Sequence, residues 1–306
     1  MSAVPEVRCA VVGSPIAHSR SPILHRAAYT ALGLSGWTYD RVELRAMQLA
    51  GWLSGLDETW RGVSVTMPVK QRALHYADSA SELAILVGAA NTLLRTEHGW
   101  HADNTDVAGL LGALDEGKTP VGRAGSATVL GAGGTASAAV AALATLGHTH
   151  VDIVVRDPTR AQALFGLLAR LGMTGQLYRW PGLGPPDRTF SGESHLSGVA
   201  DRTFSGKSPL DGALWADVVI STVPAAATED LLGHKWRAGQ TVLDVTYDPW
   251  PTALVEAAAA GGARATGGAA VLLWQAVAQV ELMTGQPAPV EAMRAALLPG
   301  GSLAPP

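Results

Sequence analysis

The feature that most constrains the fold of this 306-residue chain is a glycine-rich turn between a β-branched run and an alanine-rich run, VLGAGGTASAAVAALATLG. This order predicts a strand, a tight turn from Gly131 to Gly134 and a helix. In parallel α/β proteins the glycines let the backbone approach a pyrophosphate, and the helix N-terminus offers free N–H groups to it. A turn that only packs is the alternative, but the flanking strand and helix favour a dinucleotide site.

Apolar strand-like runs alternate with helical runs along almost the whole chain, which predicts an α/β protein. After the glycine turn come VDIVVRD, WADVVISTVP, GQTVLDVTYDP and GARATGG, and these predict a Rossmann-type doubly wound parallel sheet over residues 107–269. The runs VRCAVVG, WTYDRVEL, RGVSVTM and NTLLRT predict a second α/β domain over residues 1–106. We expect the helices of residues 270–306 to pack back on that first domain.

One segment repeats itself. The sequence DRTFSG begins at Asp187 and again at Asp201. Two copies are too few for a solenoid, and the Ser-, Gly- and Asp-rich composition predicts a duplicated surface loop over residues 187–214.

Composition narrows the partners. The net charge of −4 argues against a nucleic-acid partner, which would want a basic face. The single cysteine, Cys9, excludes an internal disulfide framework and fits a reducing compartment. The N-terminus lacks a signal-peptide pattern, no apolar run is long enough to span a bilayer, and the histidines lack metal-ligand spacing. We therefore expect a cytoplasmic protein with no membrane, nucleic-acid or metal partner.

The residues after the second Rossmann strand bear on the choice of cofactor. An acidic residue there favours NAD, whereas an arginine accommodates the 2′-phosphate of NADP. The sequence VVRDPTRA places Arg156 first and Asp157 second, and Arg160 could bracket a phosphate with Arg156. An Asp157 that only pairs with Arg160 is the alternative. The pattern favours NADP and leaves NAD open.

A lysine ends the stretch GVSVTMPVK, which otherwise carries no charge. In GVSVTMPVK, Val63 and Val65 alternate with polar residues, Pro68 ends the strand and Lys70 follows. Reduction of a carbonyl by hydride needs a proton donor, and a lysine held by a carboxylate can serve. Asp106, near the start of the helix predicted for NTDVAGLLGALDE, is a candidate partner. A solvated lysine and a helix-start aspartate are the plain alternatives.

Five motifs in order, GSPIAHSRSPILH, VSVTMPVK, GAANTLLRTEHGWHADNTDVAGL, GAGGTA and WQAVAQVELMTG, resemble those of the shikimate dehydrogenase family. The resemblance covers nearly the whole chain outside residues 187–214. It implies an N-terminal substrate-binding domain, a C-terminal Rossmann domain and reversible NADPH-dependent reduction of 3-dehydroshikimate to shikimate. It also implies a small-molecule substrate. We expect the protein to be a monomer or a homodimer.

The resemblance also implies roles for single residues. Lys70 would transfer the proton, oriented by Asp106. The substrate-binding residues would be Ser19, Ser21, Thr66, Asn91, Tyr247 and Gln275. The cofactor-binding residues would be Gly131, Ala132, Gly133, Gly134, Thr135, Arg156, Arg160, Thr222, Val223, Val245 and Gly268. The plain alternatives are a turn and N-cap role for the serines and an ordinary helix position for Gln275.

The chain departs from the family pattern at several positions. Ser64 and Arg26 stand where the family usually has Asn, Val271 where it has Met, and VRD replaces NRT after the second Rossmann strand. The last change leaves an NAD-dependent quinate/shikimate dehydrogenase as the second interpretation. A non-catalytic cofactor-binding regulator is the third, and the presence of both Lys70 and Asp106 argues against it.

Overall fold

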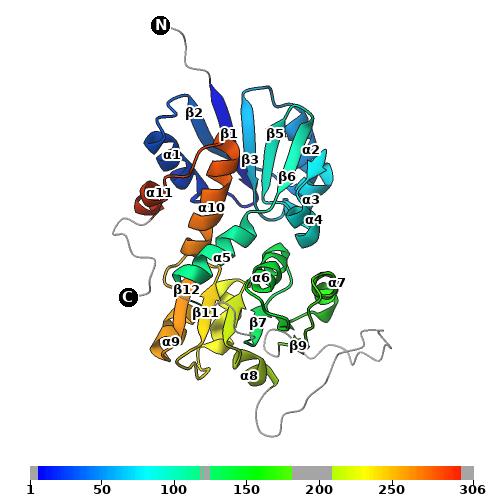
Figure 1. Ribbon diagram of the computed structural model, residues 1–306, viewed down its shortest axis with the longest axis vertical. Coiled ribbons are helices and arrows are strands. Elements are labelled where there is room, and N and C mark those ends of the chain that lie inside the picture. The colour runs from blue at the N-terminus through cyan, green and yellow to red at the C-terminus, as the bar shows by residue number, and fades with distance from the viewer. Residues whose placement is uncertain (1–5, 118, 120–124, 181–208, 298–306) are drawn as a thin grey trace. The chain divides into compact units, whose positions relative to one another are not determined.

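The computed structural model describes residues 6–117, 119, 125–180 and 209–297 (Figure 1). The chain divides into two compact units. The first takes in Met1–Gly112 together with Ala269–Leu303, and the second is built mainly from Ala113–Gly268. Helix α5 (Asp106–Glu116) therefore begins in the first unit and ends in the second.

The first unit contains a mixed six-stranded sheet in the order β2-β1-β3-β5-β6-β4. Its strands are β1 (Val7–Gly13), β2 (Trp37–Glu43), β3 (Trp60–Val65), β4 (Ser79–Ala80), β5 (Thr92–Thr96) and β6 (Gly99–Asp103). Strands β2 and β3 run parallel to β1, whereas β5 is antiparallel to both β3 and β6. The sequence predicts β1, β2, β3 and β5 but misses β4 and β6, which are too short or too polar to show a clear alternation.

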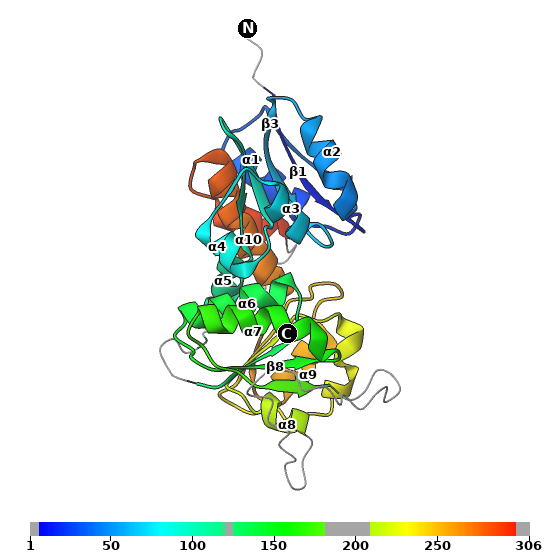
Figure 2. The same ribbon diagram turned by 90° about the vertical axis from the view of Figure 1, so that its right-hand side faces the viewer.

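Helices cover both faces of this sheet. They are α1 (Ser21–Ala31), η1 (Ala46–Gln48), α2 (Leu49–Ser54), α3 (Lys70–Tyr76), α4 (Glu82–Val87), α10 (Gly268–Thr284) and α11 (Val290–Leu297). Val63 and Val65 of β3 share a buried cluster with Leu53 of α2 and Ala73 of α3. On the other face Gly62 lies so close to α10 that a Cβ there would stand 2.8 Å from Met283 Cγ. Figure 2 shows α2 and α3 on one side of the strands and α10 on the other.

The second unit contains a parallel six-stranded sheet in the order β12-β11-β10-β7-β8-β9, with every neighbouring pair parallel. Its strands are β7 (Ala127–Leu130), β8 (Val151–Val155), β9 (Leu177–Arg179), β10 (Val218–Ser221), β11 (Thr241–Asp244) and β12 (Arg264–Gly267). The chain winds outward from β7 to β9, returns, and winds the other way from β10 to β12. This is the doubly wound Rossmann order, and the fold prediction is confirmed. The three-residue β9 was not predicted.

The helical segments of the second unit are α6 (Gly134–Thr145), η2 (Pro158–Ala161), α7 (Gln162–Arg170), α8 (Pro209–Leu214), η3 (Ala225–Leu231) and α9 (Ala253–Ala260). Helix α6 is built from small side chains, and all its residues from Ala136 to Leu143 are buried. Alanines bring a helix axis close to a sheet, as the glycine-turn motif requires. Within the described residues, no helix is long and apolar enough to cross a membrane.

The predicted surface loop over residues 187–214 needs a correction at its end. Residues 187–208 lie outside the described part of the chain, but Pro209–Leu214 forms α8. Ala213 and Leu214 are 1% exposed and pack with Leu130, Val219 and other core residues. The loop prediction is therefore wrong for these last residues, because the apolar pair before Trp215 belongs to the core.

Candidate active site

The topology of the first sheet brings three chain segments to one edge. The end of β3 lies beside the start of β5, since Ser64 pairs with Thr92, and the end of β6 lies beside the same point, since Thr92 pairs with Asp103. Lys70 begins α3 after β3, Asn91 precedes β5 and Asp106 begins α5 after β6. Residues separated by 15 to 36 positions in the sequence are thus collected by strand pairing.

Lys70 and Asp106 are in direct contact. The Lys70 ammonium donates a hydrogen bond to Asp106 Oδ2 at 2.5 Å, and the two side chains are 19% and 11% exposed. The other carboxylate oxygen, Oδ1, accepts a hydrogen bond from Asn91 Nδ2 at 2.8 Å. The structure therefore brings together the two residues that sequence analysis could only pair through the family resemblance. Lys70 is therefore not a freely solvated lysine.

Asn91 holds this cluster together. It is 2% exposed, and its Oδ1 accepts from the Thr105 backbone N–H at 2.7 Å. Its Nδ2 lies within hydrogen-bond distance of Thr105 Oγ1 (2.9 Å) and 3.4 Å from Gln275 Oε1. Gln275 comes from α10 and is 9% exposed, so it faces the site rather than solvent. Thr105 was missed as a site residue, although it stands between Asn104 and Asp106 in the motif.

The two predicted serines lie at the start of α1. Ser19 and Ser21 are 7% and 6% exposed, and the Ser21 backbone N–H donates to Ser19 Oγ at 3.4 Å. The N-cap position is Arg20, with no side-chain cap bond, so neither serine caps the helix as the plain alternative had it. The Arg41 guanidinium donates to the Ser19 carbonyl at 2.6 and 2.8 Å. Arg41 was not predicted, because its contact depends on the pairing of β1 with β2.

Thr66 lies directly after β3 and beside the end of β1. Its backbone N–H donates to the Val12 carbonyl at 2.9 Å. A Cβ on Gly13 would stand 2.4 Å from Thr66 Cγ2, so only glycine allows this approach. The close approach places Thr66 between the loop that carries the serines and the segment that carries Lys70.

In the second unit the glycine turn lies at the point where the strand order reverses. Gly131 has a φ of +109°, and a Cβ there would stand 2.5 Å from Thr222 Oγ1 and 3.2 Å from Val223 Cγ1. The predicted cofactor residues after β7 and after β10 are therefore neighbours. Helix α6 begins after Gly133 without a side-chain cap, so its first N–H groups have no side-chain acceptor.

Two further predicted residues meet at the ends of β11 and β12. A Cβ on Gly268 would stand 2.0 Å from the Val245 carbonyl oxygen, and the Gly268 N–H donates to the Thr246 carbonyl at 3.3 Å. Tyr247 follows in the same segment and is half-buried. Tyr247 belongs to the second unit, whereas the other predicted substrate residues belong to the first.

Three arginines surround the end of β8. Arg156 and Arg160 are exposed, and Arg179, which sequence analysis missed, pairs with Val155 across β8 and β9. Asp157 Oδ1 accepts from Thr159 N–H at 3.0 Å and from Thr159 Oγ1 at 2.7 Å. These hydrogen bonds lower the pKa of Asp157, with smaller contributions from Arg160 and Arg179. Asp157 thus caps the η2 turn rather than forming a close ion pair with Arg160.

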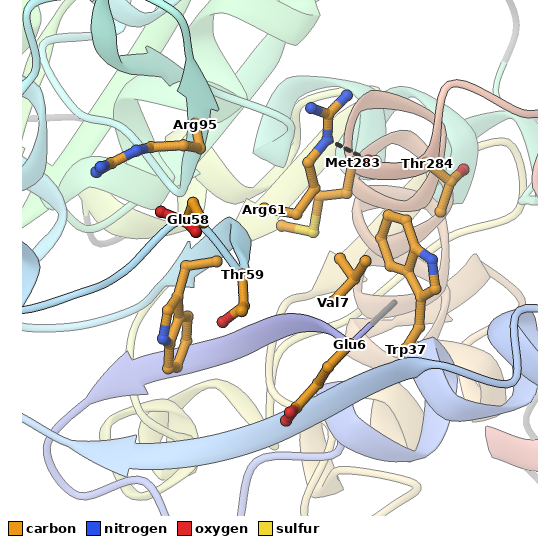
Figure 3. A pocket seen from close by; sticks show the side chains of 10 residues that line it. Glu6, Val7, Trp37, Glu58, Thr59, Arg61, Arg95, Met283 and Thr284 are labelled. Carbon is orange, nitrogen blue, oxygen red and sulfur yellow. Dashed lines mark hydrogen bonds between the residues drawn. The ribbon is translucent and has the colours of Figure 1, made fainter. Parts of the chain in front are cut away.

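A hollow of about 310 Å³ lies at the other end of the first sheet (Figure 3). It is lined where β1, β2 and β3 begin, by residues that include Val7 and Trp37, and Arg61 there donates to the Met283 carbonyl at 3.1 Å. Lys70, by contrast, follows the end of β3. We place the candidate active site at Lys70, because the hollow holds none of the predicted site residues. No group of three potential metal ligands occurs in the described residues.

Comparison with known proteins gives consistent results along the chain. Residues 11–93 match the family profile of the shikimate dehydrogenase substrate binding domain, and residues 268–298 match that of the shikimate 5′-dehydrogenase C-terminal domain. A curated shikimate dehydrogenase (NADP(+)) from Moorella thermoacetica is 33% identical over 287 residues, which cover 93% of this chain and 90% of that protein.

Solved structures agree with these matches. The crystal structure of Mycobacterium tuberculosis shikimate dehydrogenase is 43% identical, covers 95% of this chain and 98% of its own, and has a TM-score of 0.78. The Thermus thermophilus shikimate 5-dehydrogenase in complex with NADP(H) and shikimate is 29% identical, covers 95% and 98%, and has a TM-score of 0.74. The likeness therefore extends over both units.

Proposed function

This chain belongs to the shikimate dehydrogenase family, and we propose that it catalyses the reversible NADPH-dependent reduction of 3-dehydroshikimate to shikimate. The observation that carries the proposal is the contact between Lys70 and Asp106 inside a buried cluster with Asn91 and Gln275. Four side chains from four segments converge on one point, and the cluster offers both a proton donor and oriented hydrogen-bonding groups.

The second unit fits NADP. Gly131, with a φ of +109°, makes the tight turn, and a Cβ at Gly133 would face open space, so the backbone there can approach a pyrophosphate. Gly131–Thr135 and the uncapped start of α6 would hold the pyrophosphate, and Thr222, Val223, Val245 and Gly268 would border the nicotinamide. Arg156 and Arg160 would bind the 2′-phosphate. When bound, NADPH supplies the hydride.

Lys70 performs the proton step. As the C3 carbonyl of 3-dehydroshikimate gains a hydride at carbon, a proton from Lys70 Nζ forms the new O–H bond, so the ketone becomes an alcohol. The neutral amine then regains a proton from solvent. Asp106 fixes the direction of the ammonium through its Oδ2, and in the oxidation of shikimate the same amine accepts the hydroxyl proton.

The remaining predicted residues hold the substrate. Ser19 and Ser21, adjacent and largely buried, would donate hydrogen bonds to the carboxylate of shikimate. Thr66, Asn91 and Gln275 would bind its ring hydroxyls, and Tyr247 of the second unit would close the substrate side. Such fixed donors and acceptors lower the entropy cost of orienting the ring.

We also infer a cytoplasmic enzyme that acts as a monomer or homodimer. Size-exclusion chromatography with light scattering distinguishes the two oligomeric states.

The only cysteine, Cys9, takes no part in the proposed reaction. Burial raises the pKa of its thiol to about 11, so the thiol stays protonated and unreactive.

Initial rates with shikimate and with quinate, each with NADP and with NAD, test the proposal. We expect the highest kcat/KM for shikimate with NADP. A preference for quinate or for NAD would replace the proposal by a broader quinate/shikimate dehydrogenase. Binding of NADP without turnover of either substrate would indicate a non-catalytic protein.

A further inference from the structure

A second polar cluster lies within the first unit, behind the proposed active site. Its members are almost completely buried: Gln279 is 1% exposed, Ser64 3%, and His25, Tyr39 and Thr92 are at or near 0%. Buried polar groups are costly unless each finds a partner. None of these residues has a role in the proposed reaction, so the cluster calls for its own explanation.

Gln279 of α10 is at the centre of this cluster and uses its full hydrogen-bonding capacity. Its Oε1 accepts from Ser64 Oγ at 2.8 Å and lies 3.3 Å from His25 Nε2. Its Nε2 donates to the Asn91 carbonyl at 3.1 Å and to Thr92 Oγ1 at 3.0 Å. A flipped amide would place Oε1 against the Asn91 carbonyl, so the surrounding groups fix its orientation.

His25, Tyr39 and Ser64 fix the position of the Gln279 amide oxygen. Burial lowers the pKa of His25 to about 3, so the ring is neutral and carries one N–H. Because the Gln279 amide oxygen only accepts, Nε2 carries the proton and donates to it, and Nδ1, 3.5 Å from Tyr29 Oη, is the acceptor nitrogen. The His25 ring stacks on Tyr39 with centroids 3.9 Å apart, and Tyr39 Oη donates to Ser64 Oγ at 2.6 Å. His25 of α1 and Ser64 of β3 therefore both donate to Gln279 Oε1, and Tyr39 of β2 orients the Ser64 hydroxyl.

The near side of the cluster reaches the proposed site. Because Gln279 Nε2 donates to Thr92 Oγ1, the Thr92 hydroxyl is directed to donate to Asn91 Oδ1 at 2.9 Å. With Oδ1 occupied, the Asn91 amide presents Nδ2 to Asp106 Oδ1. The Asn91 carbonyl also accepts from the Val65 N–H at 2.6 Å, so both the backbone and the side chain of Asn91 are held.

We propose that Gln279 is a positioning residue for the reaction: it holds the Asn91 carbonyl and, through Thr92, the Asn91 amide, and so aligns Asp106 with Lys70. The inference rests on the proposed function. Without Gln279, the Asn91 oxygen keeps the Thr105 N–H but loses the directed Thr92 hydroxyl. The amide is then held less firmly against turning its oxygen toward the Asp106 carboxylate, where two acceptors would repel each other. Lys70 would then lose its fixed direction, while the cofactor residues of the second unit would be untouched.

The test compares Gln279→Met, which keeps the length of the side chain but not its hydrogen bonds, with Thr92→Val, which removes one hydroxyl. Thr241→Val is the matched control, because Thr241 is a buried strand threonine of the second unit whose hydroxyl has no hydrogen-bond partner among the described residues. Each protein is assayed with shikimate and NADP, and the Asn91 side-chain NH₂ signals are followed by NMR.

We expect Gln279→Met to lower kcat about tenfold or more, the effect of a lost hydrogen bond of roughly 1.5 kcal/mol, with the KM for NADP unchanged. Thr92→Val should lower kcat less, both variants should shift or broaden the Asn91 NH₂ signals, and Thr241→Val should do neither. If Gln279→Met does not fold, the kcat and the Asn91 NH₂ signals of Thr92→Val alone test the proposal. Folded variants with kcat within twofold of wild type and unshifted Asn91 signals would overturn the inference. An inactive wild-type protein would instead refute the proposed function.

Discussion

The two proposed binding regions are built in opposite ways. In the first unit, Asn91, Asp106 and Gln275 are buried and form hydrogen bonds with one another and with their neighbours. In the second, Arg156 and Arg160 are exposed, and the glycine turn offers backbone N–H groups rather than side chains. One site is held in place by its own polar side chains, and the other consists of solvated cations around a tight backbone turn.

The difference follows from the proposed ligands. A small ring with several hydroxyls is recognised by hydrogen bonds whose directions must be set in advance, and this requires a buried network. Phosphate groups carry charge, so exposed guanidinium groups and helix N-termini attract them electrostatically as well as by hydrogen bonds. We therefore expect substitutions in the first region to change catalysis and those in the second to change cofactor affinity.

The largest expected effect is that of Lys70→Ala. We expect kcat to fall by roughly two to four orders of magnitude, the usual span for a lost acid–base group, while shikimate affinity changes much less. Lys235→Ala, at an exposed lysine of the second unit, is the control and should behave as wild type. A folded Lys70→Ala protein that keeps more than about a tenth of wild-type kcat would disprove the assignment.

Two deletions of equal length separate loop from core in the repeated segment. Removing 201–214 replaces Ala213 and Leu214 before Trp215 by Val199 and Ala200. Leu214 is 1% exposed, so we expect a loss of about 2–5 kcal/mol in unfolding free energy, as for a buried Leu→Ala change. Removing 187–200 retains Leu214 and should change the unfolding free energy by only about 0.6 kcal/mol, in the stabilising direction, because halving a loop lowers its closure entropy.

Thermal melts of the two deletion proteins provide the measurement. Equal melting temperatures would show that Leu214 contributes little to the core. Loss of NADP binding with unchanged stability would instead indicate that the repeat takes part in cofactor binding.

Arg156→Ala should sharpen the comparison on the cofactor side. A charge-assisted hydrogen bond contributes about 1.5–3 kcal/mol, so we expect the KM for NADP to rise roughly 10- to 100-fold with little change for NAD. Asp157→Ala should leave NADP use unchanged or improve it, because its carboxylate is turned toward Thr159. Equal losses with both cofactors for Arg156→Ala would indicate a structural role, and a strong loss of NAD activity for Asp157→Ala would favour the NAD-linked alternative.

Acidification should change the stability of the two units in opposite directions. The folded-state pKa of His25, about 3, lies below its ordinary value of 6.5, so below pH 6.5 the unfolded chain binds a proton that the folded chain does not. Stability of the first unit should therefore fall by up to about 1.4 kcal/mol per pH unit as the pH drops below 6.5. Burial raises the pKa of Asp244 in the second unit, and this gives the opposite sign.

Hydrogen exchange at pH 7 and pH 5.5, corrected for intrinsic rates, measures this difference. Peptides from β1 and α1 should lose protection at the lower pH, and peptides from β11 should not. The same loss in His25→Gln would show that another group is responsible.

Local motifs predicted much of the molecule. The turn around Gly131 could be identified because strand, glycines and helix follow one another in the sequence. Lys70 and Asp106 could be named as candidates, but their contact depends on the pairing of β3, β5 and β6, and β6 was not predicted. Arg179 was also missed because its strand was not predicted: the three-residue β9 is too short to show a hydrophobic period.

Gln279 shows what closer attention to spacing could have found. It follows Gln275 by four positions on an otherwise apolar stretch of α10, so the two amides lie on one face of the helix. Two buried amides on one face indicate a polar network inside the fold. Their partners on β3 and β5 could not be identified from the sequence, because they depend on how α10 packs against the sheet.

Calorimetric titration of shikimate into the cofactor-free protein tests most directly the claim that the network around Asn91 forms the substrate site without the cofactor. We expect shikimate to bind without cofactor, with a Kd within about tenfold of that measured with bound NADPH, a combination that cannot react; tenfold corresponds to about 1.4 kcal/mol. Asp106→Asn should weaken binding under both conditions, and Arg156→Ala under neither. Binding of shikimate only in the presence of NADPH would contradict the account, because the network around Asn91 would then not suffice to form the site.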